Sequence, residues 1–148
     1  MPSLTDFLRK QKDAAQSPDI AKKNEEWINA VSSLLTQIRI WLADAEQQNL
    51  IKVDSDEISI TEESTGTYTA PGLTVTVPST RKTVKVVPIG RTIIGANGRV
   101  DLRTSQGSHM LLYLADQGVW VHGTGPHPAY FPVLNEDLFT HLLTRALE

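Results

Sequence analysis

The stretch IIGANGRVDL (Ile93–Leu102) decides between two kinds of fold. Its glycines, arginine and aspartate are typical of a phosphate-binding loop, which would lead directly into a helix. The glycines match neither common nucleotide-binding spacing, however, and an alternating Arg-Val-Asp-Leu-Arg pattern stands where the helix would begin. Asn97-Gly98 is typical of a two-residue type I′ turn. We therefore predict a β-hairpin here, with strands near 91–95 and 99–104.

The chain around this hairpin, from Leu50 to His122, is rich in threonine, valine and isoleucine, and glycine or proline interrupts it at short intervals. This composition predicts a meander of short antiparallel strands. In Leu73–Val77 apolar residues alternate with threonine, which predicts one sheet face under a helix and one face in water. The expected strands lie near 50–53, 57–62, 67–70, 73–77, 83–88, 91–95, 99–104, 109–115 and 119–122, with turns that include Pro71-Gly72.

Helices are expected on both sides of this β region. Apolar residues spaced by three and four, including Trp27, Val31, Leu34, Ile38 and Trp41, predict a long amphipathic helix over about 18–48. Ser17-Pro18-Asp19 is a typical start for it, and Asn135 is a typical cap for a C-terminal helix over about 135–147. Ser3 to Ala15 is expected to form a short, loosely attached helix with a capping arrangement between Ser3 and Asp6.

This order of elements predicts a single α+β domain over residues 1–148, with a predominantly antiparallel β-sheet packed against the long N-terminal helix. The chain of 148 residues contains no cysteine, which excludes disulfides and thiolate chemistry. No segment has the roughly 20 apolar residues that a membrane-spanning helix needs. We expect a cytoplasmic protein that works without a membrane, a metal or a cofactor.

Charge is unevenly distributed along the chain, although the net charge is only -3. Residues 80–103 contain six basic side chains and one acidic side chain. If Val100 and Leu102 face the core, the residues expected together on the other sheet face are Arg99, Asp101 and Arg103, with Arg91 approaching from the partner strand. We favour a mutually paired, solvated surface, and the alternative is a patch for an anionic partner that also includes Arg81, Lys82 and Lys85. Nucleic acid is an unlikely partner at a sequence pI of about 5.8.

Histidines and aromatic residues give a second set of candidates near the end of the β region. His122 and His127 lie in or beside a glycine-proline loop, without the spacing of a metal site. Trp120 and His122 alternate with Val119 and Val121, so we expect them on the face opposite the core. Together with Tyr130 they would form an aromatic recognition surface, and the alternative is that the C-terminal helix covers Trp120.

The sequence contains no nucleophile motif, cofactor fingerprint or metal spacing. We therefore predict a non-catalytic protein-protein interaction module, such as an adaptor, a chaperone-like factor or an immunity or antitoxin component, with another protein as its partner. A homodimer through the helix 18–48 is a further option. The alternative is a small enzyme or binding protein for an anionic ligand, which uses segment 81–103 and the loop histidines. The candidate binding residues are Arg91, Arg99, Asp101, Arg103, Trp120, His122, His127 and Tyr130.

Overall fold

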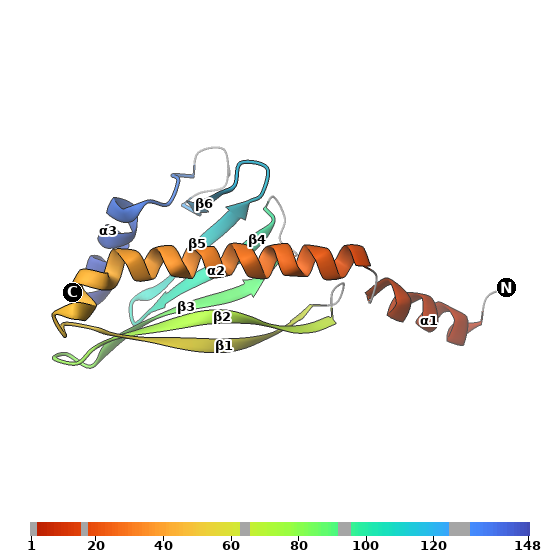
Figure 1. Cartoon of the computed structure of the whole chain (residues 1–148), viewed down its shortest axis with the longest axis horizontal. Helices are drawn as coiled ribbons and strands as arrows, with labels where there is room; N and C mark the ends of the chain where they lie inside the picture. The colour runs from red at the N-terminus through yellow and green to blue at the C-terminus, as the bar shows by residue number, and fades with distance from the viewer. Residues whose placement is uncertain (1–2, 16–17, 63–65, 92–95, 125–130) are drawn as a thin grey trace.

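The computed structural model describes residues 3–15, 18–62, 66–91, 96–124 and 131–148, with only the backbone described for 11–15 and 18–20. The elements are helices α1 (Leu4–Ala15) and α2 (Pro18–Gln47), strands β1 (Lys52–Glu62), β2 (Gly66–Val77), β3 (Lys82–Gly90), β4 (Gly98–Thr104), β5 (Gly107–Leu114) and β6 (Val119–His122), and helix α3 (Glu136–Leu147) (Figure 1). The α+β class and the antiparallel sheet are confirmed.

The six strands form one sheet in sequence order, and every neighbouring pair is antiparallel. Helix α2 crosses one face of this sheet, and α3 lies beside the C-terminal part of α2 (Figure 1). Both helices contribute to one main core, so they cover the same sheet face. The most deeply buried members of this core include Val31, Ile38, Leu73, Val75, Val84, Val86, Val100, Leu102, Leu111 and Phe139.

The long helix forms where the apolar spacing predicts it. Its buried side chains, Trp27, Val31, Leu34, Leu35, Ile38 and Leu42, follow the three-and-four spacing of one helix face. The expected start at Ser17 lies outside the described residues. In α1 the backbone N–H of Asp6 donates to Ser3 Oγ over 3.2 Å, as the capping pattern predicts.

Asn135 caps α3 in the predicted manner. Its backbone is extended, with φ -141° and ψ 179°, and its Oδ1 accepts a hydrogen bond from the N–H of Leu138 at 2.8 Å. We expect Asn135→Ala to lower the free energy of unfolding by about 1 kcal/mol, because one N–H of the first turn loses its acceptor. Urea denaturation followed by circular dichroism measures this loss. Asn135→Asp keeps the acceptor and is the control; equal stability of the alanine and aspartate variants would contradict this role.

The predicted turn at Pro71-Gly72 is wrong, because β2 continues through it and pairs with β1 along its whole length. Residues before Leu73 have no partner in β3, so a proline is tolerated there as it is in an edge strand. Gly72 is required by close packing and not by a turn, because a Cβ atom there would lie 2.8 Å from the backbone oxygen of Val86. The short strands expected at 50–53 and 57–62 likewise merge into β1.

The predicted type I′ turn at Asn97-Gly98 is also wrong. Gly98 is the first residue of β4, where it pairs with Tyr113, and neither Asn97 nor Gly98 has the positive φ angle that this turn requires. The Trp27 ring packs so closely on Gly98 that a Cβ atom there would overlap it. A strand follows Gly98 and not a helix, so the argument against a phosphate loop holds. Most of the strand expected at 91–95 lies outside the described residues.

A smaller core covers part of the other sheet face. It consists of Leu112, Val121 and Phe131, with Met110 and Val119 packed at its side. Residues 131–134 lie along the edge of β6, since the N–H of His122 donates to the carbonyl of Pro132 and the N–H of Leu134 donates to the carbonyl of Trp120. This segment leads the chain back from β6 to α3 on the helix-covered face.

Candidate functional site

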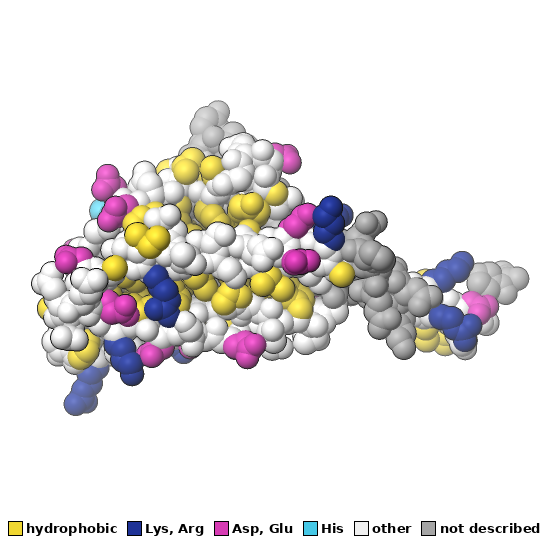
Figure 2. All heavy atoms as spheres, in the orientation of Figure 1, with side chains coloured by type: hydrophobic (Ala, Val, Ile, Leu, Met, Phe, Trp, Pro, Cys, Tyr) yellow, Lys and Arg dark blue, Asp and Glu magenta, His cyan; other side chains and the backbone are white. Residues whose placement is uncertain are grey.

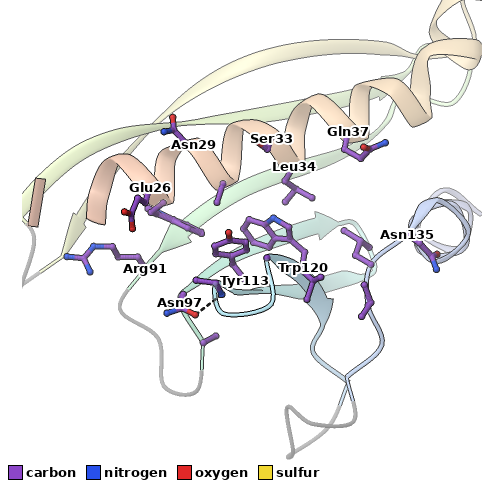
Figure 3. A pocket seen from close by; sticks show the side chains of 18 of the residues that line it. Glu26, Asn29, Ser33, Leu34, Gln37, Arg91, Asn97, Tyr113, Trp120 and Asn135 are labelled. Atoms are coloured by element: carbon purple, nitrogen blue, oxygen red, sulfur yellow. Dashed lines mark hydrogen bonds between the residues drawn. The ribbon is translucent and has the colours of Figure 1, made fainter. Parts of the chain in front are cut away.

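A groove of about 1190 Å³ opens between α2, the β5–β6 hairpin and the segment that precedes α3 (Figure 3). Polar and apolar residues both line it, and the apolar and aromatic ones are Trp27, Ala30, Leu34, Trp41, Ala96, Tyr113, Ala115, Val119, Trp120, Val133 and Leu134. Hydrophobic side chains are exposed along both flanks of α2 in the space-filling view (Figure 2). Solvent therefore reaches an apolar surface on the helix-covered side of the protein.

All three tryptophans of the chain line this groove. Tyr113 and Trp120 are directly opposite each other on β5 and β6, with ring centroids 5.1 Å apart. Trp27 of α2 approaches Trp120 to 5.8 Å between centroids. Trp27 is buried, whereas Tyr113, Trp120 and Trp41 are half-buried and present part of their rings to the groove. Figure 3 shows Tyr113 and Trp120 side by side below α2, with Leu34 directed toward Trp120.

The expectation that Trp120 and His122 point away from the core is wrong for both residues. The register pairs Leu111 with His122 and Tyr113 with Trp120, and Leu111 belongs to the main core under the helices. Trp120 therefore faces α2, and Val121 faces the smaller core on the other side. Val119, Trp120 and Val121 are all apolar. The sequence of this part of β6 therefore does not indicate which side chains face the main core and which face the other side of the sheet. On this face Trp120 packs against Trp27 of α2.

A hydrogen-bonded network supports the groove at the N-terminal half of α2. Glu62 accepts from the Tyr68 hydroxyl at 2.6 Å and from the backbone N–H of Arg91 at 3.0 Å. Burial, and secondly the hydrogen bond to the Glu62 carboxylate, raise the pKa of Tyr68 well above its usual value, so this side chain stays neutral. The Arg91 Nε donates to Asn24 Oδ1 at 2.8 Å, which holds this arginine against α2.

The indole N–H of Trp27 is buried beside this network and has no hydrogen-bond partner among the described residues. It lies close enough to the Tyr68 oxygen to favour the ionised phenol slightly, but this effect is outweighed by burial and by Glu62. An unsatisfied buried donor has a free-energy cost. The ring of Trp27 is positioned by its packing on Gly98 and Trp120.

Polar side chains form the rim of the groove. On α2 the rim consists of Asn29, Ser33 and Gln37, which are spaced by four and so lie along one side of the helix. Asn97 and Asn135 face them from the other elements, and Asn97 Oδ1 accepts from the N–H of Ala115 at 2.8 Å. The charged rim residues are Lys23, Glu26, Arg91 and Glu136. An apolar floor with a polar rim is the usual anatomy of a recognition surface.

Arg99, Asp101 and Arg103 share the sheet face opposite the main core, as predicted, and Arg91 lies apart from them. Arg99 donates from Nε to Asp101 Oδ1 at 2.7 Å and from Nη2 to Asp101 Oδ2 at 3.0 Å, on the sheet face opposite the groove. These bonds raise the pKa of Arg99, and Asp101 is 6% exposed. Arg103 is exposed on the same face beside Lys85, whereas Arg91 lies at the groove rim.

The remaining predicted residues are not brought together at the groove. His122 faces the helix-covered side next to His109, with ring centroids 5.4 Å apart. Burial, and secondly the neighbouring His109, lower the pKa of His122. His127 and Tyr130 lie outside the described residues. Within the described residues no group of three or more His, Asp or Glu side chains could hold a metal ion.

The sequence places only Trp120 and Arg91 of the groove among the candidates. Trp27 and Trp41 belong to the apolar stripe of α2, and this pattern is the same for a core residue and for a residue that borders a groove. Tyr113 is equally ambiguous in β5. One feature could have pointed to the groove: the chain has only three tryptophans, and all of them lie in elements that the fold brings together.

The fold and the groove define an α+β protein with an aromatic cleft between its long helix and a terminal hairpin. No protein-family model matches the chain, and no curated protein or solved structure is similar enough to count as a relative. Among the described helices, none combines the length and the apolar character that crossing a bilayer requires.

Proposed function

We propose that this chain is a non-catalytic binding protein whose groove receives an apolar segment of another protein. The observation that carries this proposal is the convergence of Trp27, Trp41, Tyr113 and Trp120 on one open groove with a polar rim. Tryptophan and tyrosine dominate the binding energy of many protein interfaces, because each buries a large apolar area with little loss of side-chain entropy.

The size of the groove favours a protein segment over a small molecule. Small-molecule sites have volumes of roughly 300–1,000 Å³, and this groove reaches about 1190 Å³ and is open along α2. An amphipathic helix places its apolar side chains in such a groove at positions i, i+3, i+4 and i+7. The rim amides and hydroxyls of Asn29, Ser33 and Gln37 can then bond the polar flank of the bound segment.

The alternative function, binding of an anionic ligand by segment 81–103, has less support. Arg99 is already paired with the buried Asp101. The Nζ of Lys82 donates to the carbonyls of Leu147 and Glu148 at the end of α3. Arg91 is turned toward α2. These three cations lie in three separate places.

Tryptophan fluorescence tests the proposal, because every tryptophan borders the groove. The probe is a synthetic 15-residue amphipathic helix with leucine at i, i+3, i+4 and i+7 and no aromatic residue, and the control is its scrambled isomer. We expect a saturable change of emission with the amphipathic probe only. Val133→Glu places a charge on a groove residue that is 52% exposed, and we expect it to weaken binding at least tenfold.

The matched control is Ile40→Glu, on a residue of α2 that is 62% exposed and does not line the groove. It should bind the probe as the wild type does. Equal responses to the two peptides, or equal affinities of the Val133→Glu and Ile40→Glu variants, would refute binding in the groove.

A further inference from the structure

We propose that the groove of one copy of this chain is occupied by α1 of a second copy, so that two chains exchange their N-terminal helices. This inference rests on the proposed function, since it names a second copy of this chain as the protein whose segment the groove receives. The proposed dimer differs from the homodimer through the helix 18–48 considered above. Here α2 does not pair with α2 of the other copy but forms one wall of each binding groove.

The apolar face of helix α1 is largely exposed. Leu4, Phe7 and Leu8 are 72%, 54% and 52% exposed, and their spacing places them on one side of the helix. Every described side chain from Ser3 to Lys10 is exposed. Figure 1 shows α1 beyond the N-terminal end of α2 and away from the sheet. A helix of this length is marginal in water by itself, so it needs a surface to pack on.

The dimensions of the groove suit this helix. The groove residues on α2 extend from Lys23 to Trp41, which is about 27 Å at 1.5 Å per residue. Helix α1 has 12 residues and is therefore about 18 Å long. The whole apolar face of α1 can lie within the groove, with Phe7 and Leu8 against the exposed edges of Tyr113 and Trp120.

Two rim carboxylates can pair with cations of α1, and the rim also carries Lys23 and Arg91. Arg9 and Lys10 follow the apolar residues of α1 and are exposed, and the groove rim carries Glu26 and Glu136. Neither carboxylate forms an ion pair with a described cation; the salt bridges of the described residues are Lys52–Asp54 and Arg99–Asp101. These two cations near the middle of α1 can therefore pair with rim carboxylates that form no ion pair within the described residues.

The direction of α1 favours a second copy over the chain's own groove. Helix α1 continues away from the body, while the groove extends along α2 in the opposite direction (Figure 1). A two-fold arrangement fills both grooves and covers both α1 faces at once, which leaves neither surface for further assembly.

Complementation between two variants tests the exchange in the full chain. The α1 variant is Phe7→Glu with Leu8→Glu, and the groove variant is Val133→Glu. Sedimentation equilibrium should give twice the 16.3 kDa chain mass for the wild type and for the Ile40→Glu control at micromolar concentration. Each of the two variants alone should dimerise at least tenfold more weakly. Their equimolar mixture should recover dimers, because the intact α1 of the groove variant can enter the intact groove of the α1 variant.

Other partners of α1 predict different results in these experiments. A wild type that stays monomeric up to several hundred micromolar would overturn the exchange, and so would its pelleting as a monomer with anionic phospholipid vesicles. Pairing of α1 with α1 predicts that the groove variant dimerises normally by itself, which would also overturn it. If the synthetic probe binds the groove but the chain is monomeric, the exchange fails and the proposed function stands. Circular dichroism confirms that both variants fold.

Discussion

Gly98→Ala is expected to lower the free energy of unfolding by about 3 kcal/mol, at the upper end of the usual cost of overpacking a core. The new methyl group would overlap the six-membered ring of Trp27, which is 2% exposed and is held between the sheet and Trp120. Because the ring is closely packed, moving it also displaces the side chains in contact with it. Urea denaturation monitored by circular dichroism measures the effect. Because Trp27 lines the groove, the variant should also bind the amphipathic probe more weakly.

Gly123→Ala is the matched control for this substitution. A Cβ atom at Gly123 would meet the terminal methyl of Met110, the end of a flexible side chain that can move aside. We expect a change within about 0.5 kcal/mol, as for substitutions away from the core. In a Trp27→Leu background the cost of Gly98→Ala should fall, because the overlapping ring is gone. Equal costs in both backgrounds would show that the ring is not the cause.

Phe139→Ala is expected to destabilise the protein by about 3–5 kcal/mol, the usual range for removing a buried aromatic side chain. Phe139 is 1% exposed and packs against Trp41 at 5.4 Å between ring centroids. It is the largest of the side chains through which α3 attaches to the core. Its removal leaves a cavity between α3 and α2 that the surrounding side chains can fill only in part. Urea denaturation followed by circular dichroism measures this loss.

Two further variants separate the cavity from other effects at this position. Phe139→Leu refills most of the space and should cost less than half as much as the alanine variant. Thr140→Ala alters the neighbouring exposed residue and should be close to neutral. If Phe139→Ala and Thr140→Ala had similar stabilities, α3 would contribute little to the core, and the C-terminal end of the groove would have another support.

Local sequence patterns were sufficient for the helices and for the antiparallel sheet. The spacing of Trp27, Val31 and Ile38 defines one face of α2, and Asn135 defines the start of α3, because these signals depend only on residues within a few positions of one another. The predictions failed where one local signal has two physical meanings. Glycine and proline at Pro71-Gly72 suit a turn, but they also suit an unpaired strand edge beside a close backbone contact.

The candidate site was less predictable than the fold. Grouping Arg91 with Arg99 relied on a type I′ turn at Asn97-Gly98 that the chain does not form. Arg91 lies against Asn24 of α2, and Arg99 lies on the far sheet face. The groove combines α2, β5, β6 and the segment before α3, which are distant in sequence. Patterns within a short stretch of sequence do not predict contacts between such distant elements.

By itself the sequence determined where helices and strands form and that the class is α+β, because hydrophobic periodicity and capping act over short ranges of chain. Only the tertiary structure decided that Trp120 faces α2 and that Gly98 accommodates the ring of Trp27. Strand β6 has apolar side chains on both faces, so its register with β5 decides which of them face α2. A glycine is required at position 98 because the ring of Trp27, which belongs to another element, packs against it. The aromatic groove is the product of those two long-range contacts.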